Sequence, residues 1–367
     1  MTTKSHSIDK LFLTLISLLT IGGFFIFSSA SLGLVARDTG ARIGSITLNQ
    51  VVSLILGCIA FFIMSRIKYS LLKKYSFYIF VGALIINALV FIPGIAMEHG
   101  GATRWIDLKV FTFQPSELLK IAFIIYCAAW LSSIKEKVTD LKSGLVPFLV
   151  MMGLVGLLLL AQSDTDTLVV ILAAGTAMYF TAGASIKHIG ILILLGALCL
   201  SAVVVARPYA RERIMTFINP AADSQGSGYQ IQQSLIAIGS GQITGRGFGQ
   251  SVRKFNYLPE PIGDSIFAVA AEEFGFIGCV FIVILFLSLA IHGFKMSTHA
   301  PDVFSGLMVV GIVILISIES FMNISAMLGI IPLSGMPLLF VSHGGTALIM
   351  VLGASGIVAN ISRFSKQ

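Results

Sequence analysis

The chain has 367 residues, of which 56% are hydrophobic and 11% are charged, and its formal net charge is +7. Soluble domains average about 45–50% apolar and about 25% charged residues, so this composition excludes a soluble globule and predicts a polytopic membrane protein. The positive charge does not indicate a nucleic-acid-binding protein, because the 24 Lys and Arg residues are scattered between apolar runs.

In chain order, ten apolar segments approach the roughly 20 residues that a helix needs to cross a bilayer. They cover residues 11–34, 46–65, 76–97, 115–132, 145–162, 167–183, 187–206, 265–291, 303–330 and 337–361. The alternating pattern of a membrane β-barrel is missing. We therefore expect an all-α integral membrane protein of ten transmembrane helices, folded as one polytopic domain over residues 1–367.

The distribution of Lys and Arg between the loops predicts the orientation of these helices. If the N-terminus is cytoplasmic, the short outer loops hold four such residues, namely Arg37, Arg42, Arg104 and Lys109. The inner side then holds thirteen, namely Lys4, Lys10, Arg66, Lys68, Lys73, Lys74, Lys135, Lys137, Lys142, Lys187, Lys295, Arg363 and Lys366. Both termini are therefore predicted to be cytoplasmic, with residues 207–264 as a large extracytoplasmic loop between the seventh and eighth spans.

The cysteines and histidines predict no metal site. All four cysteines fall inside apolar runs without Cys-x-x-Cys spacing, as small hydrophobic residues do. The six histidines form no His-Glu-x-x-His pattern.

The loop 207–264 carries a predicted helix in which Ile231, Leu235 and Ile238 recur at helical spacing. Such a helix either lies in the membrane interface or caps the bundle. A glycine-rich stretch follows it, with Arg246 inside and Lys254 shortly after. The stretch is either a phosphate-binding nest, to which these cations contribute, or an ordinary turn.

Asp264 follows a Pro-Glu-Pro-Ile-Gly break that contains Glu260, and it stands at the expected start of the eighth span. One explanation is that its carboxylate caps free N–H groups of the first helical turn. The other is that partial burial raises its pKa, so that it acts as a general base.

Three of the charged residues within predicted spans need an explanation. Glu117 and Lys120 are three residues apart, which places them on one helix face where each neutralises the other. A structural ion pair is the simpler explanation, and a role in a cavity is the alternative. Glu319 has no evident partner, so it must face the bundle interior or become neutral.

Polar residues also interrupt the apolar pattern at two outer positions. Asp164 and Asp166 share a very short loop, where turn stabilisation explains them as well as cation or sugar binding does. The segments 332–337 and 342–346, the second of which begins with Ser342, break the pattern near the tenth span. Broken backbone at membrane depth is tolerated where it lines a cavity, so a polar cavity opening outward is predicted.

These motifs together resemble those of the SEDS family, the FtsW, RodA and SpoVE polymerases of bacterial peptidoglycan. The resemblance covers nearly the whole chain and leans toward FtsW and SpoVE in the form LPEPIGDSIFA. It rests on an ordered set of stretches, which are GGATRWI, QPSELLK, YQIQQSLIAIGSGQITGRGFGQS, KFNYLPEPIGDSIFAVAAEEFGFIG and NISAMLGIIPLSGMPLLFVSHGGTALI. It implies ten transmembrane helices, cytoplasmic termini and a large outer loop, in agreement with the spans above.

The resemblance also implies a glycosyltransferase that polymerises lipid II at the outer face of the bacterial cytoplasmic membrane, during division or elongation. Asp264 matches the family's catalytic aspartate. The candidate cavity or substrate-binding residues are Arg104, Trp105, Glu117, Lys120, Asp164, Arg246, Lys254, Glu260 and Ser342. The chain departs from the family between Gln162 and Thr167, where it keeps Asp164 but lacks the usual proline and glycine.

In this interpretation, Asp264 takes a proton from the 4-hydroxyl of the acceptor sugar while that oxygen attacks the anomeric carbon of the donor. Undecaprenyl pyrophosphate leaves. Basic residues such as Arg246 or Lys254, or a divalent cation (Mg²⁺ or Mn²⁺), would stabilise its charge.

The resemblance further implies a class B penicillin-binding protein, a transpeptidase, as partner. Its single transmembrane helix is expected on the lipid-facing side of the eighth and ninth spans, at Gly275, Gly278, Gly306 and Gly311. A lipid II flippase and a scaffold that recruits wall synthases are the alternative functions. The short inner loops carry no comparable motifs, which favours chemistry at the outer face over translocation.

Overall fold

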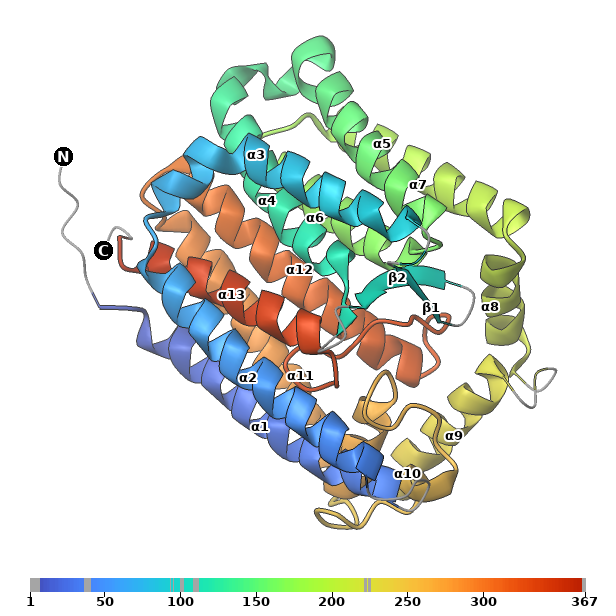
Figure 1. The fold of residues 1–367 in the computed structure, drawn as a ribbon. Helices are drawn as coiled ribbons and strands as arrows, with labels where there is room; N and C mark the ends of the chain where they lie inside the picture. Colours follow the sequence, from blue (N-terminus) through green and yellow to red (C-terminus); the bar gives the residue numbers. More distant parts are fainter. Residues whose placement is uncertain are drawn as a thin grey trace.

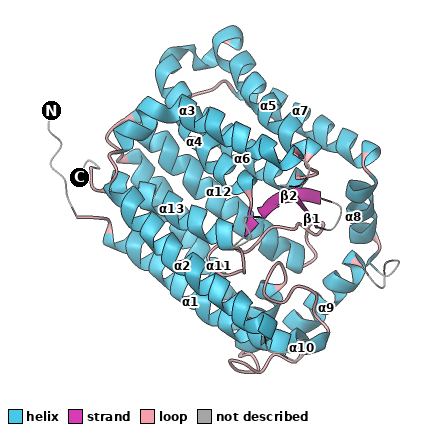
Figure 2. Ribbon diagram, viewed as in Figure 1, coloured by secondary structure: helices cyan, strands magenta, loops and turns pink. Residues whose placement is uncertain are grey.

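The computed structural model of the protein describes residues 7–35, 41–92, 94, 96–99, 102–107, 112–220, 223 and 226–364. Figures 1 and 2 show a bundle of long helices with one small sheet. Within the described residues, nine helical segments are long and apolar enough to cross a membrane, and one of them, Leu141–Ala161, joins a short π-helical turn to the helix after it. A tenth helix, α6, is apolar but shorter. These ten helices are α1 (Lys10–Val35), α2 (Ala41–Arg66), α3 (Tyr69–Ala88), α4 (Pro115–Ile134), α5 (Val146–Ala161), α6 (Thr165–Thr181), α7 (Ile186–Ala206), α11 (Ile266–Thr298), α12 (Val303–Met327) and α13 (Gly345–Ser362). The predicted all-α membrane architecture is confirmed, with nine to ten spans.

Three predicted spans have the wrong bounds, and one of them, 265–291, ends seven residues before the end of α11 at Thr298. The sequence predicts a span at 76–97, whereas α3 begins at Tyr69 and the chain has entered strand β1 (Ala96–His99) by residue 96. It also predicts a span at 337–361, whereas α13 begins only at Gly345. The preceding loop buries Leu338 and Phe340 inside the protein. Hydropathy alone does not distinguish such a buried loop from a helix.

α12 lies at the centre of the bundle, with 72% of its most apolar stretch buried inside the protein. It packs against α4, α6, α11 and α13 (Figure 1). By contrast, α7 buries only His188 and Leu192, and this helix lies at the edge of the bundle. Polar residues on α12 therefore face the molecular interior.

The loop 207–264 contains three helices, α8 (Pro208–Ile218), α9 (Ser227–Ser240) and α10 (Arg253–Asn256). α9 is the predicted amphipathic helix. It packs against α11 and α12 and buries Ile231, Ser234 and Ala237. α9 thus packs on the bundle as a cap does, while Leu235 and Ile236 stay exposed, and its placement in the membrane interface stays a prediction.

A small antiparallel sheet connects α3 to α4. Its strands are β1, β2 (Ala102–Asp107) and β3 (Thr112–Phe113), in that order. Arg104 and Ile106 are both buried, as expected for residues that alternate along one face of β2. The sheet thus directs Arg104 inward. Three short helical turns complete the fold, and they are η1 (Leu89–Phe91), η2 (Lys135–Thr139) and the π-helical η3 (Leu141–Leu145).

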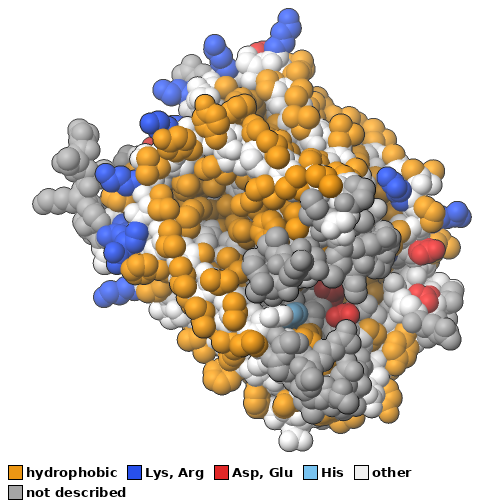
Figure 3. Space-filling model, in the orientation of Figure 1, with side chains coloured by type: hydrophobic (Ala, Val, Ile, Leu, Met, Phe, Trp, Pro, Cys, Tyr) orange, Lys and Arg blue, Asp and Glu red, His pale blue; other side chains and the backbone are white. Residues whose placement is uncertain are grey.

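The two ends of the chain meet at one end of the bundle (Figure 1). The N–H of Asp9 donates to Oγ of Ser362 at 3.1 Å, and Oδ1 of Asp9 lies 2.8 Å from Nε2 of His292. Most of the Lys and Arg side chains visible in Figure 3 lie along its upper and left edges, near this end and beside a broad hydrophobic face, and the others lie at the right edge. This distribution agrees with the positive-inside rule, and the cytoplasmic placement of the termini stays a prediction.

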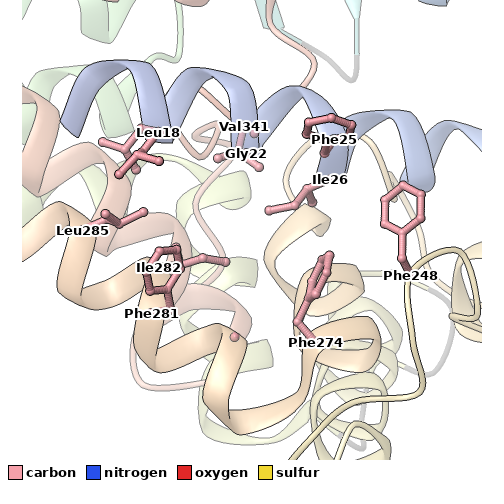
Figure 4. A pocket seen from close by; sticks show the side chains of 13 residues that line it. Leu18, Gly22, Phe25, Ile26, Phe248, Phe274, Phe281, Ile282, Leu285 and Val341 are labelled. Carbon is pink, nitrogen blue, oxygen red and sulfur yellow. The ribbon is translucent and has the colours of Figure 1, made fainter. Parts of the chain in front are cut away.

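An apolar groove of about 570 Å³ lies between α1 and α11 (Figure 4). Phe25 of α1 and Phe281 of α11 line it and are more than half exposed. Every residue that lines the groove is apolar or glycine, so it offers no group for acid–base chemistry.

The predicted row of small residues for a partner helix is only partly open. Gly278 lines the groove between α1 and α11, although a Cβ there would lie 2.2 Å from Cβ of Phe274. A Cβ at Gly311 would lie 2.6 Å from Cγ2 of Ile124, and one at Gly275 would lie 2.3 Å from the backbone nitrogen of Gly245. The prediction that Gly275 and Gly311 face the membrane is therefore wrong, because both pack against this chain's own residues.

Candidate functional site

Asp264 stands two residues before α11, on a turn that the sequence builds tightly. The N–H groups of Gly263 and Ser265 both donate to the carbonyl oxygen of Glu260, at 3.1 and 3.2 Å. Glu260 itself has a φ of 44°, which is unusual for a residue other than glycine. This turn presents the Asp264 side chain at the N-terminal end of α11.

The Asp264 carboxylate faces an ion pair between α6 and α8. Nη1 of Arg213 lies 2.8 Å from Oδ2 of Asp166, and the N–H of Gly335 donates to the same oxygen at 3.3 Å. A Cβ built on Gly335 would lie 3.5 Å from Nη2 of Arg213, 3.9 Å from Oδ2 of Asp264 and 4.0 Å from Oδ2 of Asp166. Residues from four distant segments therefore converge on one point.

Burial raises the pKa of Asp264, and the Glu260 carboxylate raises it further. Arg213 lowers it, Asp166 raises it and Arg104 lowers it, and the resulting pKa is about 7. Ser265, not Asp264, is the N-cap residue of α11. Within the described residues, no hydrogen bond to the Asp264 carboxylate occurs, so capping does not account for it. A carboxylate with a pKa near neutrality is suited to general base catalysis.

The backbone around Asp264 is held by α12 and by the loop before α13. Nδ2 of Asn323 donates to the carbonyl oxygens of Asp264 and Met336, each at 2.8 Å. Oγ of Ser342 donates to the carbonyl of Gly263 at 2.8 Å and accepts from the N–H of Leu338. Ser342 was predicted to bind substrate, but the structure uses its hydroxyl to join the two loops.

Arg104 and Asp164 form a second charged pair beside the site. Nη1 of Arg104 lies 3.5 Å from Oδ1 of Asp164, and the guanidinium also donates to the carbonyl of Ser163. Both side chains are buried. Among the described residues, Nε of Arg104 and Oδ2 of Asp164 have no hydrogen-bond partner. Trp105, the neighbour of Arg104 in the predicted motif, is half-buried on β2.

Lys120 is the centre of a buried ion triad beneath this region. Its Nζ lies 2.9 Å from Oε1 of Glu117 and 2.6 Å from Oε2 of Glu319. The predicted pair is confirmed, and Glu319 has the partner that the sequence did not reveal. Glu319 lies one helical turn before Asn323 on α12, so both residues share one helix face. α12 thus connects the triad to the Asp264 turn.

Lys254 lies in a separate cluster. Its Nζ is fully buried, 2.7 Å from Oε1 of Glu273, 2.9 Å from Oγ of Ser29 and 3.0 Å from the carbonyl of Gly249. The prediction that Lys254 contacts a phosphate does not agree with this placement, because these groups already surround its ammonium. Its position fixes α10 against α1 and α11.

The glycine-rich loop behaves as a turn rather than as a phosphate nest. The N–H groups of Gly245, Arg246 and Gly247 donate to the carbonyls of Gly241, Glu272 and Glu273, at 2.8, 3.0 and 2.9 Å. They are therefore not free to bind an anion. Nε of Arg246 lies 3.5 Å from Oε1 of Glu272, although 42% of its side chain stays exposed.

The protein's own side chains do not complete a divalent-cation site. Within the described residues, no group of three or more His, Cys, Asp or Glu side chains is arranged to hold a metal ion. Asp166 and Asp264 face one point, but Arg213 already binds Asp166. Mg²⁺ needs near-octahedral oxygen coordination, which two carboxylates, one of them bound to Arg213, do not supply by themselves.

Arg213, Asn323 and Gly335 are the site residues that the sequence did not single out. Asp166 carried a signal, as the second aspartate of a very short loop between two predicted spans. Arg213 lies in a basic run without distinctive spacing. A pocket of about 520 Å³ adjoins this region at the N-terminal end of α6 and the C-terminal end of α7, and its lining includes Ser163, Thr165, Arg207 and Tyr209.

A sequence profile of the FtsW/RodA/SpoVE family, described as cell cycle proteins, matches residues 9–367. The chain is 36% identical to stage V sporulation protein E of Bacillus subtilis (strain 168) over 367 residues, which is 100% of both chains. It is 38% identical over 314 residues to the probable peptidoglycan glycosyltransferase FtsW of Geobacter metallireducens, which covers 86% of this chain and 84% of that relative.

Two solved structures have a similar fold. The rod shape determining protein RodA of Thermus thermophilus matches with a TM-score of 0.71 and 22% identity, over 98% of both chains. A chain from a study of the structural coordination of polymerization and crosslinking by a peptidoglycan synthase complex matches with a TM-score of 0.78 and 24% identity, over 97% of this chain and 98% of that chain.

Proposed function

The chain belongs to the FtsW/RodA/SpoVE family of cell cycle proteins, and from this we propose that it is a peptidoglycan glycosyltransferase that polymerises lipid II. It is a multi-pass membrane protein, and we place its site at the outer face of the bacterial cytoplasmic membrane. The observation that carries the proposal is the Asp264 carboxylate, which faces the same point as Arg213 and Asp166.

In the proposed step, Asp264 takes the proton from a hydroxyl of the acceptor sugar. The oxygen of that hydroxyl forms a bond to the anomeric carbon of the donor. The bond from this carbon to the diphosphate oxygen breaks, and the polyprenyl diphosphate leaves with the electron pair. The pKa of about 7 allows Asp264 to be ionised before the step and protonated after it.

The charges of Arg104 and Arg213 lower the pKa of Asp264, whereas Lys254 is enclosed by its own ion pair. We propose that these two arginines help to stabilise the charge that develops on the departing diphosphate. Arg246 stays partly exposed but lies with Glu272, away from this pair. A requirement for Mg²⁺ or Mn²⁺ is a separate proposal, which removal of divalent ions with EDTA and their stepwise return would test.

We also propose a class B penicillin-binding protein as partner. One of the similar folds comes from a peptidoglycan synthase complex in which polymerization and crosslinking are coordinated. A single transmembrane helix of the partner would pack on the lipid-facing side of α11 and α12, near Gly278 and Gly306.

The direct test is polymerisation of labelled lipid II by the purified protein in detergent, with and without the partner. We expect labelled glycan strands. A parallel assay in vesicles measures whether the protein moves lipid II between leaflets. Accelerated movement without strand formation would show that the flippase alternative is correct.

A further inference from the structure

Gly335 lies in the loop between α12 and α13 and borders the charged side chains of the site. A Cβ at this position would lie 3.5 Å from Nη2 of Arg213, 3.9 Å from Oδ2 of Asp264 and 4.0 Å from Oδ2 of Asp166. The N–H of Gly335 donates to the same Asp166 oxygen at 3.3 Å. The position of residue 335 is therefore fixed relative to both carboxylates.

The backbone conformation does not require a glycine at this position. The φ of Gly335 lies outside the positive region that favours glycine. The three distances from its Cβ position are ordinary van der Waals contacts, so an alanine side chain meets no clash. Alanine at a compatible position normally stabilises a protein by restricting the unfolded chain. The missing side chain therefore relieves no strain in the folded protein, and its effect is to leave space in front of the charged groups.

Gly335 is also exposed, so the space in front of it is reachable from outside. The groups around this space suit a saccharide, because carboxylates accept hydrogen bonds from hydroxyl groups and the arginine donates them. We propose that Gly335 is a specificity-determining residue that keeps open the space in which the acceptor sugar presents its hydroxyl to Asp264. This inference rests on the proposed function, and it places the acceptor sugar in the space next to Gly335.

The test is a series of substitutions of increasing size, namely Gly335→Ala, Gly335→Val and Gly335→Leu. We expect the melting temperature of Gly335→Ala to equal or exceed that of the wild type. Polymerisation should fall as the side chain grows, by roughly 10-fold for alanine and roughly 100-fold for leucine. The larger figure is about the loss that a misplacement of about 1 Å causes. The loss with alanine should appear mainly as a higher KM for lipid II.

Gly344→Ala is the matched control from the same loop. Gly344 has an extended φ of −161°. A Cβ there would lie 3.4 Å from Cβ of Ala347 and 3.8 Å from Cβ of Pro337, which are apolar atoms at similar contact distances. This variant should polymerise lipid II as the wild type does.

A binding measurement without turnover separates this inference from the proposed function. Lipid II binding is compared between Asp264→Asn and the double variant Asp264→Asn with Gly335→Leu. At least 10-fold weaker binding by the double variant supports the inference, even if the wild type fails to polymerise lipid II and the proposed function fails. Wild-type polymerisation by Gly335→Leu, equal binding by the two proteins, or a melting temperature of Gly335→Ala that falls together with its activity would overturn the inference.

Discussion

At the scale of single residues, Asp264 determines how we expect the rate of polymerisation to depend on pH. Burial, reinforced by Glu260, raises its pKa to about 7, and a general base works only when it is ionised. The rate of polymerisation should therefore rise with pH, reach half of its maximum near pH 7 and level off above it. Initial rates measured between about pH 5.5 and 9 test this. A flat profile across this range would rule out Asp264 as the titrating base.

The charge of Arg213 should shift the dependence of the polymerisation rate on pH. Because its guanidinium lowers the pKa of Asp264, Arg213→Gln should shift the midpoint to higher pH, and Arg213→Lys should shift it less. Arg211→Gln is the control, since Arg211 is an exposed cation on the same helix. An equal shift in both glutamine variants would mean that overall charge, rather than the position of Arg213, is responsible.

The ion triad around Lys120 makes a separate prediction about stability. Lys120→Met leaves Glu117 and Glu319 buried without their cation, so unfolding should become easier by about 3–5 kcal/mol. The triple variant Glu117→Gln, Lys120→Met, Glu319→Gln removes all three charges and should recover much of that loss. Denaturant unfolding in detergent measures both variants. If Lys120→Met is as stable as the wild type, the triad is not a structural unit.

At the scale of elements, a break in α11 connects the glycine-rich loop to the Asp264 turn. Gly275 has a φ of 64°, and the N–H groups of Phe276 and Ile277 donate to the carbonyls of Gln242 and Ile243, at 2.9 and 3.1 Å. The first two turns of α11 are thus anchored by the loop rather than by a continuous helix. The orientation of the Asp264 turn depends on this contact.

Gly245→Ala should disturb this contact strongly. The φ of Gly245 is +80°, and a Cβ there would lie 2.1 Å from the carbonyl oxygen of Glu273. Gly249→Ala is the control, with a φ of +79° and no atom within 4 Å of its Cβ. Both variants carry the left-handed cost of about 1–2 kcal/mol, so only the clash distinguishes them. We expect a lower melting temperature and less polymerisation for Gly245→Ala than for Gly249→Ala, and equal effects would show that the contact is unimportant.

The proposed partner helix can be located by cysteine crosslinking. Ile284 and Ile291 of α11 are exposed large apolar side chains, and they lie seven residues apart, on one face of the helix. Cysteines at these two positions should form disulfides with cysteines in the partner's transmembrane helix. Leu11 of α1 and Tyr78 of α3 are exposed control positions. Crosslinking at the control positions alone would place the partner elsewhere.

At the scale of the whole molecule, hydropathy and a few motifs predict the membrane architecture and the position of Asp264. They do not predict which charged residues meet. Lys120 and Glu319 are separated by 199 residues, and Asp166 and Arg213 by 47. No local periodicity encodes such pairs, because helix packing brings them together. For the same reason, the sequence does not reveal that Lys254 is buried against Glu273.

The central claim is that Asp264 acts as a base rather than as a structural residue. The structure places its carboxylate beside Arg213 and Asp166 without a capping role. Its folded-state pKa is raised to about 7, so the folded state loses stability as pH rises from about 4 to 7 and Asp264 ionises. Asparagine avoids this loss and keeps the size of the side chain, so Asp264→Asn should be at least as stable as the wild type at about pH 8.

The most direct measurement compares lipid II polymerisation and melting temperature for Asp264→Asn, Asp264→Ala and the wild type at about pH 8. We predict that both variants lose polymerisation by roughly 10²–10⁴-fold, the contribution of general acid–base catalysis, while Asp264→Asn keeps its melting temperature. An Asp264→Asn protein that polymerises lipid II at the wild-type rate would contradict the account.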